Sequence, residues 1–275
     1  MKLLAGDVGG TKTVLALFEE GRLLRREVYP SGRYRSLAEM TREFLGSAAH
    51  EVSRACFGVA GPVSDEVCRA TNLPWIIDAR QLERELSLPR VALVNDFHAL
   101  SIGIGELPAE DFVTLHDTPS DRSGPWVVIG AGTGLGQAVL VKGAAGLEVL
   151  SSEGGHTEFG PRNELEIELL RFLLARHDHV SYERLVSGPG LKTIYDFLRE
   201  HGAVGESEAV RRELAASPDS GPAIVSAHGL AGDDPLCTKA LDLFASLYGA
   251  EAGNLALKVV ARGGVYVAGG IAPKI

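Results

Sequence analysis

The chain has 275 residues, 45% of which are hydrophobic, and a formal net charge of −9 at pH 7. That length and composition predict one large or two medium globular domains with buried cores, and they argue against a disordered chain. The acidic balance argues against a general nucleic-acid binder, although backbone amides could still hold an anionic ligand locally.

Cysteine usage and hydropathy indicate a cytosolic protein. Cys56, Cys68 and Cys237 are scattered and form no CxxC pair, so we expect reduced thiols, with neither a structural zinc site nor a disulfide framework. The apolar stretch before Asp7 is too short for a secretory signal, and no run is long enough to span a membrane. We therefore expect a cytoplasmic location and no membrane partner.

The first predicted element is a strand–turn–strand over residues 3–20, and a further turn at residues 20–21 leads into a third strand. Its successive glycines leave backbone N–H groups uncovered, which makes a concave nest for phosphate oxygens. Asp7 would repel bare phosphate, but it fits if a divalent cation lies between them with water interposed. Thr11 and Lys12 could then donate to phosphate. A plain hairpin in which Asp7 bonds the turn amides fits the local pattern equally well.

Helical and strand patterns alternate in the next stretch. Residues 36–48 have helical spacing, and Asp78 could cap the start of a second helix. The short apolar runs 55–61 and 91–95 are typical of parallel strands covered on both faces. We therefore expect an α/β arrangement in the first third of the chain.

Asn95 and Asp96 stand at the carboxyl end of the 91–95 strand, and a helix is expected just after them. In open α/β sheets ligands bind at that edge, where Asp96 could take a proton from a substrate hydroxyl. The alternative is that Asn95 or Asp96 simply caps the helix, and the local pattern alone favours capping.

A second strand–turn–strand covers residues 125–143, with the glycine-rich sequence GAGTGLG at 130–136. Because the segment after these glycines has a strand pattern and not a helical one, a dinucleotide-binding Rossmann site is disfavoured and a phosphate-binding turn remains. The two glycine hairpins resemble each other, which indicates two similar halves that each offer a glycine turn to a shared cleft. A chance likeness between two glycine-rich hairpins explains the pattern equally well.

A compact loop at residues 151–161 carries Glu153, His156 and Glu158 around two glycines. Such donors and acceptors suit sugar hydroxyls, whereas a metal site lacks the expected ligand spacing. An exposed loop with unrelated polar residues is an equal alternative. Glu183 precedes a helical turn, where capping or solvent exposure is the simpler interpretation.

The remaining patterns predict two helices and one strand. Residues 163–177 form a strongly amphipathic helical pattern, and residues 237–261 form a long one. Residues 263–272 predict a final buried strand followed by a turn.

In this order, the segments resemble the bacterial ATP-dependent glucokinases of the hexokinase–actin–Hsp70 superfamily, over nearly the whole chain. The segments that carry the likeness are DVGGTKT, FGVAGPV, TNLPW, LVNDFHAL, GAGTGLGQA, EGGHTEFGP, ERLVSGPGL, GNLAL and VYVAGGIAPK. The resemblance implies an α/β protein with a two-domain actin-like (ribonuclease H-like) ATPase fold and a central cleft. It implies a small domain over residues 1–106 and a large domain over residues 107–275.

The resemblance also implies a role for each matching residue. Asp96 would be the general base that takes the proton of the glucose 6-hydroxyl. The residues that would bind the sugar hydroxyls are Asn95, Glu153, His156 and Glu183. The residues that would bind ATP are Asp7, Gly9, Gly10, Thr11 and Lys12 in the first hairpin, Gly132, Thr133 and Gly134 in the second, and Gly269 and Gly270 near the adenosine. Asp7 would also hold the metal, through water.

The implied reaction is phosphorylation of glucose by MgATP, which gives glucose 6-phosphate and ADP and is the first step of glycolysis. ATP and Mg²⁺ would be the cofactors, and a homodimer is possible because dimers are common in similar proteins. The alternatives are a kinase for another hexose or amino sugar, or a non-catalytic sugar-binding regulator. Such a regulator would normally need an added DNA-binding segment.

Two departures from the family pattern matter. No cysteine lies between Cys68 and Cys237, so the chain lacks the cysteine-rich zinc motif of the related repressor/kinase group and is placed outside it. Family members also continue past the position of Ile275 with further helix and strand that return to the small domain. We therefore expect the last part of the fold to be missing.

Overall fold

The computed structural model describes residues 1–275 except 71–72, 120, 122, 145 and 203, and except the side chains of 47–49. Part of the TNLPW motif therefore lies outside the described residues. The chain divides into two compact units, Met1–Phe112 (unit 1) and Val113–Ile275 (unit 2). The domain limits 1–106 and 107–275, and the missing final part of the fold, stay predictions.

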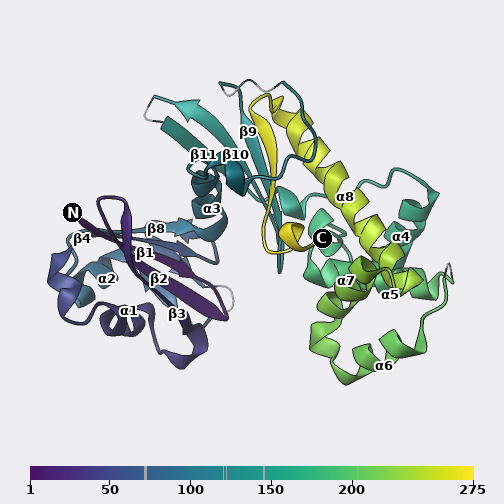
Figure 1. Ribbon diagram of the computed structural model, residues 1–275, viewed down its shortest axis with the longest axis horizontal. Coiled ribbons are helices and arrows are strands. Elements are labelled where there is room, and N and C mark those ends of the chain that lie inside the picture. Colours follow the sequence, from purple (N-terminus) through teal and green to yellow (C-terminus); the bar gives the residue numbers. More distant parts are fainter. Residues whose placement is uncertain (71–72, 120, 122, 145, 203) are drawn as a thin grey trace. The chain divides into compact units, whose positions relative to one another are not determined.

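Unit 1 is built on a five-stranded sheet with the order β3-β2-β1-β4-β8 (Figure 1). Its strands are β1 (Lys2–Val8), β2 (Lys12–Glu19), β3 (Arg22–Pro30), β4 (Val52–Val59) and β8 (Val91–Asn95). The pairs β1–β2 and β2–β3 are antiparallel, whereas β1–β4 and β4–β8 are parallel, as predicted. The parallel pairs bring the carboxyl ends of β1, β4 and β8 to one edge of the sheet.

Helices and a small second sheet complete unit 1. They are α1 (Leu37–Leu45), α2 (Ala79–Leu86) and α3 (Asp96–Ile104), with β5 (Val63–Ser64), β6 (Val67–Arg69) and β7 (Ile76–Asp78). Asp78 caps α2, as predicted, by accepting a hydrogen bond from the Gln81 N–H at 3.0 Å. The core of unit 1 includes Leu4, Leu15, Met40, Phe44 and Phe57, each at most 1% exposed.

Unit 2 contains a four-stranded sheet with the order β11-β10-β9-β12. Its strands are β9 (Trp126–Ala131), β10 (Leu135–Gly143), β11 (Gly146–Ser152) and β12 (Gly264–Ala268). Three antiparallel strands precede a strand that pairs parallel to the first of them, which repeats the pattern β3-β2-β1-β4 of unit 1. This shared order supports duplicated halves over a chance likeness of two hairpins.

The prediction that residues 263–272 form a buried strand is wrong in one respect. The strand exists as β12, but it lies at the edge of its sheet and pairs only with β9 among the described residues. Val265 and Val267 on one face are 44% and 36% exposed. An apolar run of this length reads the same in an edge strand as in a central one, so composition alone could not separate the two.

The helices of unit 2 are α4 (Glu164–Leu174), α5 (Gly188–Glu200), α6 (Glu208–Ala216), α7 (Gly221–Ala231) and α8 (Pro235–Val259). The predicted helices over 163–177 and 237–261 are confirmed as α4 and α8. α8 begins two residues early because Asp234 caps it and Pro235 suits its first turn. It packs against α5 and α7 and reaches the strands β9 and β12 (Figure 1). None of the described helices combines the length and apolarity that a membrane span requires.

A histidine that bridges two carboxylates joins α6 to α7. His228 is in α7, and its Nε2 lies 3.0 Å from Oε2 of Glu213 in α6. Its Nδ1 lies 2.8 Å from Oδ1 of Asp233. The hydrogen bonds to Glu213 and then to Asp233 raise the pKa of His228 above 6.5. The fold therefore favours the imidazolium form, which donates from both nitrogens.

We expect His228→Gln to destabilise the protein most at mildly acidic pH. The contribution of His228 is fully present below pH 6.5, its unfolded value, and is lost as the pH rises through the higher pKa of the folded state. Urea unfolding of the parent and the variant at about pH 6 and about pH 9 measures the difference. A loss of free energy of unfolding that is equal at both pH values would contradict the charged bridge.

Candidate active site

The first glycine turn, Gly9–Lys12, joins β1 to β2 and is braced by Ser31. The Gly9 N–H donates to the Lys12 carbonyl at 3.1 Å, and the Ser31 hydroxyl donates to the Gly9 carbonyl at 2.7 Å. The Ser31 N–H also donates to the Thr11 carbonyl at 3.0 Å. Thr11 and Lys12 keep exposed side chains, so the turn presents them to solvent on a fixed backbone.

Asp7 lies near the end of β1, just before this turn, and its side chain is exposed. Among the described hydrogen bonds it accepts none from the turn amides, so the structure does not support the plain-hairpin alternative. The described residues hold no group of three or more His, Cys, Asp or Glu side chains that could ligate a metal by themselves. A divalent cation at Asp7 would take its other ligands from water and phosphate, which is the usual environment of Mg²⁺.

Asn95 caps α3, and Asp96 is the first residue of that helix. Asn95 Oδ1 accepts hydrogen bonds from the N–H groups of Phe97 and His98, at 3.0 and 3.2 Å. Its Nδ2 donates to the Gly61 carbonyl at 3.1 Å. The capping alternative is therefore confirmed for Asn95, whose side chain also hydrogen-bonds the Asp96 carboxylate.

The Asp96 carboxylate is accessible to solvent and yet partly enclosed by protein. Burial raises the pKa of Asp96, and the negative charge of Asp7 raises it further. The Phe97 N–H donates to the Asp96 carboxylate at 2.8 Å and opposes this rise, because it stabilises the charged form. The strand register explains the proximity, because Asp7 pairs with Gly58 on β4 and Gly58 pairs with Val94 on β8. Two carboxylates thus share the carboxyl edge of the unit 1 sheet.

The second glycine turn, Gly132–Gly134, joins β9 to β10 and is fixed from two sides. The Gly132 N–H donates to the Gly134 carbonyl, and the Gly188 N–H of α5 donates to the Gly132 carbonyl, both at 2.8 Å. A Cβ on Gly134 would lie 2.5 Å from Glu183 Oε2, so this carboxylate rests directly on the turn. Thr133, at the tip, is exposed.

The turn Gly269–Gly270 follows β12 and lies against the end of β9. Gly269 has a φ of +85°, and a Cβ on it would lie 2.5 Å from the Ala131 carbonyl oxygen, so glycine is required there. The Ile271 N–H donates to the same oxygen at 3.2 Å. Because Ala131 directly precedes Gly132, the two glycine segments of unit 2 that the sequence predicts for the nucleotide are neighbours.

Tyr248 of α8 joins these two glycine segments. Its hydroxyl accepts a hydrogen bond from the Ala131 N–H at 2.8 Å and donates to the Ala268 carbonyl at 3.0 Å. These two partners directly precede Gly132 and Gly269. Burial raises the pKa of Tyr248 to about 12, so the hydroxyl keeps its proton at neutral pH. Sequence reasoning missed this residue because a tyrosine in an apolar helical pattern indicates only core packing.

Glu153, His156 and Glu183, which the sequence predicts separately, form one cluster in unit 2. His156 Nδ1 lies 3.5 Å from Glu153 Oε2, and its Nε2 lies 3.6 Å from Glu183 Oε1. Glu183 Oε2 accepts a hydrogen bond from the Leu135 N–H at 2.9 Å, so it binds the end of the second glycine turn and does not cap a helix. The side chains of Glu153 and His156 are 86% and 59% exposed, which leaves the cluster open to a ligand. Glu158 instead pairs with a different histidine.

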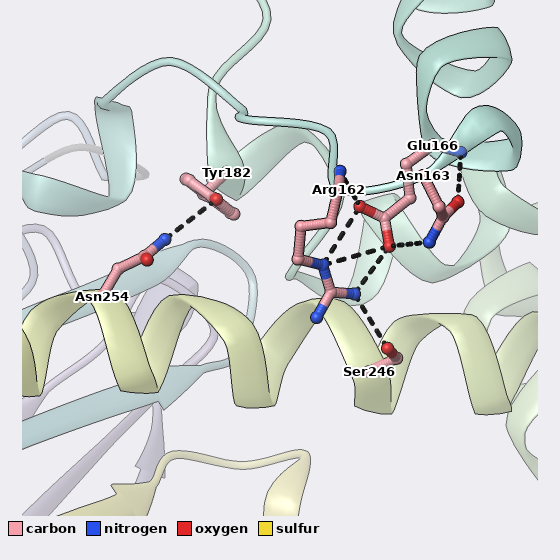
Figure 2. Close-up of polar contacts among 6 residues, drawn as sticks. All are labelled: Arg162, Asn163, Glu166, Tyr182, Ser246 and Asn254. Carbon is pink, nitrogen blue, oxygen red and sulfur yellow. Dashed lines mark hydrogen bonds and ion pairs between the residues drawn. The ribbon is translucent and has the colours of Figure 1, made fainter.

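Helix α8 also holds the segment that connects His156 to Glu183, through the polar contacts that Figure 2 shows. The Asn254 side chain donates to the Tyr182 hydroxyl at 3.0 Å, next to the glutamate at 183. Arg162 pairs with the buried Glu166 carboxylate at 2.6 Å and donates to Ser246 Oγ at 2.8 Å. One helix therefore contacts the segment between His156 and Glu183 near both of its ends.

Sequence comparison identifies relatives of the chain over almost its full length. The glucokinase family model matches residues 4–275. A glucokinase of Nostoc sp. is 45% identical, over 99% of this chain and 85% of that protein. A glucokinase of Chromobacterium violaceum is 39% identical, over 99% of this chain and 76% of that protein.

Solved structures agree with the sequence relatives. The crystal structure of a glucokinase from an Antarctic psychrotroph matches with a TM-score of 0.83 and 30% identity, over 99% of this chain and 84% of that one. A ROK-family glucokinase from Streptomyces griseus, in complex with glucose and AMPPNP, matches with a TM-score of 0.63 and 21% identity, over 100% and 85%. At that identity the likeness concerns the fold alone, and it confirms the mixed α/β class of these actin-like sugar kinases.

We expect Tyr248→Phe to lower the free energy of unfolding by about 1–3 kcal/mol, because the buried Ala131 N–H loses its acceptor. Tyr34→Phe is the matched control, since Tyr34 donates to Glu43, whose carboxylate can turn to water instead. Urea unfolding of the parent and both variants measures the two losses. Equal losses would show that the Tyr248 hydroxyl does not hold the strand ends.

Proposed function

The chain belongs to the glucokinase family, and on that premise we propose that it transfers the γ-phosphoryl group of ATP to the 6-hydroxyl of glucose. The products are glucose 6-phosphate and ADP, and the reaction is the first step of glycolysis. The observation that carries the proposal is the cluster of Glu153, His156 and Glu183, in which Glu183 is bonded to the end of the second glycine turn. Groups suited to sugar hydroxyls are thereby joined to an element suited to phosphate.

Asp96 is the proposed general base. Its carboxylate takes the proton of the 6-hydroxyl while the sugar oxygen bonds to the γ-phosphorus and the bond from that phosphorus to ADP breaks. Such transfers depend mainly on positioning and on neutralising charge, so little covalent chemistry is asked of the protein. The raised pKa of Asp96 makes its carboxylate a stronger base.

The proposed sugar ligands are Asn95, Glu153, His156 and Glu183. The carboxylates accept hydrogen bonds from hydroxyls, His156 can donate or accept, and the Asn95 side chain stands beside the proposed base, to which it is hydrogen-bonded. A site of this kind leaves polar groups unpaired when a hydroxyl is missing, and it can reject such an analogue by about 10⁴-fold.

The glycine turns are the proposed nucleotide ligands. The residues assigned to the phosphates are Gly9, Gly10, Thr11 and Lys12 of the first turn and Gly132, Thr133 and Gly134 of the second, with Gly269 and Gly270 assigned to the adenosine. Asp7 would hold Mg²⁺ through water, since it is exposed, accepts no described hydrogen bond from the turn and offers the oxygen ligand that this cation prefers. When bound, the ion would neutralise phosphate charge.

The proposal extends to the architecture and the setting. Residues 1–106 and 107–275 would form the small and large domains of a two-domain actin-like ATPase with a central cleft, so that catalysis uses groups from both. Closure on glucose would exclude water and limit wasteful hydrolysis of ATP. A cytoplasmic location, a homodimer and the absence of a nucleic-acid partner belong to the same proposal.

A coupled ADP-release assay across a panel of sugars tests the proposal. We expect faster turnover with glucose than with mannose or N-acetylated amino sugars. Preference for another sugar would replace glucose as the substrate, and sugar binding without turnover would indicate a non-catalytic regulator.

In the same assay, Asp96→Asn should lower kcat by about 10²–10⁴-fold, because the amide cannot take the hydroxyl proton. Asp219→Asn, at an exposed position of unit 2, is the matched control and should keep the parent rate. Turnover by Asp96→Asn equal to that of the parent would remove Asp96 from its role.

The acid limb of the pH–rate profile should report the raised pKa of Asp96. Since the carboxylate must be ionised to act as a base, kcat/KM should fall as the pH drops through a pKa above the ordinary 3.8. Asp7→Asn removes a neighbouring negative charge and should move this limb to lower pH, whatever it does to the absolute rate. A limb that stays in place or moves to higher pH contradicts the coupling of the two carboxylates.

A further inference from the structure

Glu251 of α8 lies one helical turn after Tyr248 and is completely buried, with 0% of its surface exposed. Its carboxylate accepts two hydrogen bonds, from Gln137 Nε2 at 2.7 Å and from Asn254 Nδ2 at 3.0 Å. No Lys, Arg or His pairs with it among the ion pairs of the described chain. A buried carboxylate held by two amides is costly, and its two bonds lead to two different segments of unit 2.

The first bond leads to the loop that carries Glu153 and His156. Gln137 belongs to β10 and is 2% exposed, and its Oε1 has no hydrogen-bond partner among the described residues. A Cβ on Gly154 would overlap this Oε1, so the Gln137 amide is the surface on which the turn Gly154–His156 rests. Because Glu251 binds the other end of that amide, it fixes the orientation of Gln137 under the loop.

The second bond leads to the segment that carries Glu183. Asn254 uses its other amide hydrogen to donate to the Tyr182 hydroxyl at 3.0 Å (Figure 2). Tyr182 directly precedes Glu183, and its N–H donates to the Thr157 carbonyl at 3.0 Å. The two oxygens of Glu251 are thus connected to the two segments whose side chains meet in the cluster.

We propose that Glu251 is a positioning residue for the sugar, which sets the placement of the Glu153–His156 loop relative to Glu183. This inference rests on the proposed function. It separates the tasks of two residues on one helix, because Tyr248 bonds the strand ends that precede the nucleotide turns and Glu251 supports the sugar ligands. Glu251 touches no reacting atom and acts through Gln137 and Asn254.

The hydrogen-bond pattern supplies a sharp variant. Glu251→Gln keeps the shape but replaces one acceptor by a donor, so that with Gln137 and Asn254 oriented as they are, either orientation of the new amide faces a donor. If Gln137 turns to accept from the new amide, its Nε2 replaces its Oε1 against Gly154, so the support under the loop changes in that case too. Adding Gln137→Glu restores complementarity. The carboxylate at 137 accepts from the amide N–H of the glutamine at 251, and the carbonyl oxygen of that glutamine still accepts from Asn254. The double variant E251Q/Q137E therefore reverses the defect only if the hydrogen-bond pattern is what matters.

Steady-state kinetics with glucose and ATP varied separately test the inference. We expect Glu251→Gln to raise the KM for glucose about tenfold and to leave the KM for ATP within about twofold, since small misplacements of binding groups are costly. E251Q/Q137E should recover much of the loss. Tyr248→Phe, on the same helix, is the matched control and should change the KM for ATP more than that for glucose.

The inference is overturned if Glu251→Gln leaves the KM for glucose unchanged, or if it raises the KM for glucose and the KM for ATP together. It is also overturned if E251Q/Q137E has no lower KM for glucose than Glu251→Gln. If Glu251→Gln does not fold, Asn254→Ala cuts one of the two branches, and an unchanged KM for glucose there overturns the inference equally. A parent protein without glucose-dependent ADP release refutes the proposed function and this inference together. An active parent whose variants match it refutes this inference alone.

Discussion

The arrangement of unit 2 depends on one side chain between two strand ends, the Tyr248 hydroxyl. Backbone groups that leave a sheet need new partners, and a hydroxyl can both accept and donate. Tyr248 therefore satisfies the last N–H of β9 and the last carbonyl of β12 at once. Each of these groups stands directly before a turn in which the glycines carry no side chain that could anchor it. A glycine turn lets a ligand approach the backbone closely, but it is more flexible than other turns. The Tyr248 hydrogen bonds hold the residue that precedes each turn and so limit this flexibility.

The same helix face continues with Glu251 and Asn254, at intervals of three residues. Residues at this spacing follow one another along one side of a helix, and the three cover about 9 Å of its length. The hydrogen-bond partners of these three residues are Ala131, Gln137 and Tyr182, which lie 117, 114 and 72 residues away in sequence. A rigid helix therefore fixes the spacing between the proposed nucleotide turns and the proposed sugar ligands of unit 2. Because its buried polar groups must be paired to be tolerated, the helix fits in a single register.

Local patterns in the sequence predicted most elements, although none was predicted for β5–β7, β11 or α5–α7. Long-range pairing explains the errors at particular residues. The cap at Asp78 and the hairpins depend on neighbours a few residues away, which the sequence displays. Glu183 was expected to cap or to face solvent, because its partner, the Leu135 N–H, is 48 residues distant. Buried polar groups of α8 such as Glu251 look like ordinary helix residues until the fold supplies their partners. The exposed face of β12 was missed for the same reason, since an apolar run does not say which strands will pair with it.

The two halves share a strand order but add different chemistry to it. Unit 1 follows its parallel strands with α3 and the Asp96 carboxylate, whereas unit 2 places its polar cluster beside the second glycine turn. Both additions are acidic, and the whole chain carries a net charge of −9, so a polyphosphate meets repulsion on approach. Bare amides attract anions without adding a charged side chain, which makes a glycine turn the fitting phosphate ligand in an acidic protein. The repeated strand order supplies that turn twice, and the differences between the two halves leave carboxylates for the hydroxyl chemistry that the proposal assigns to them.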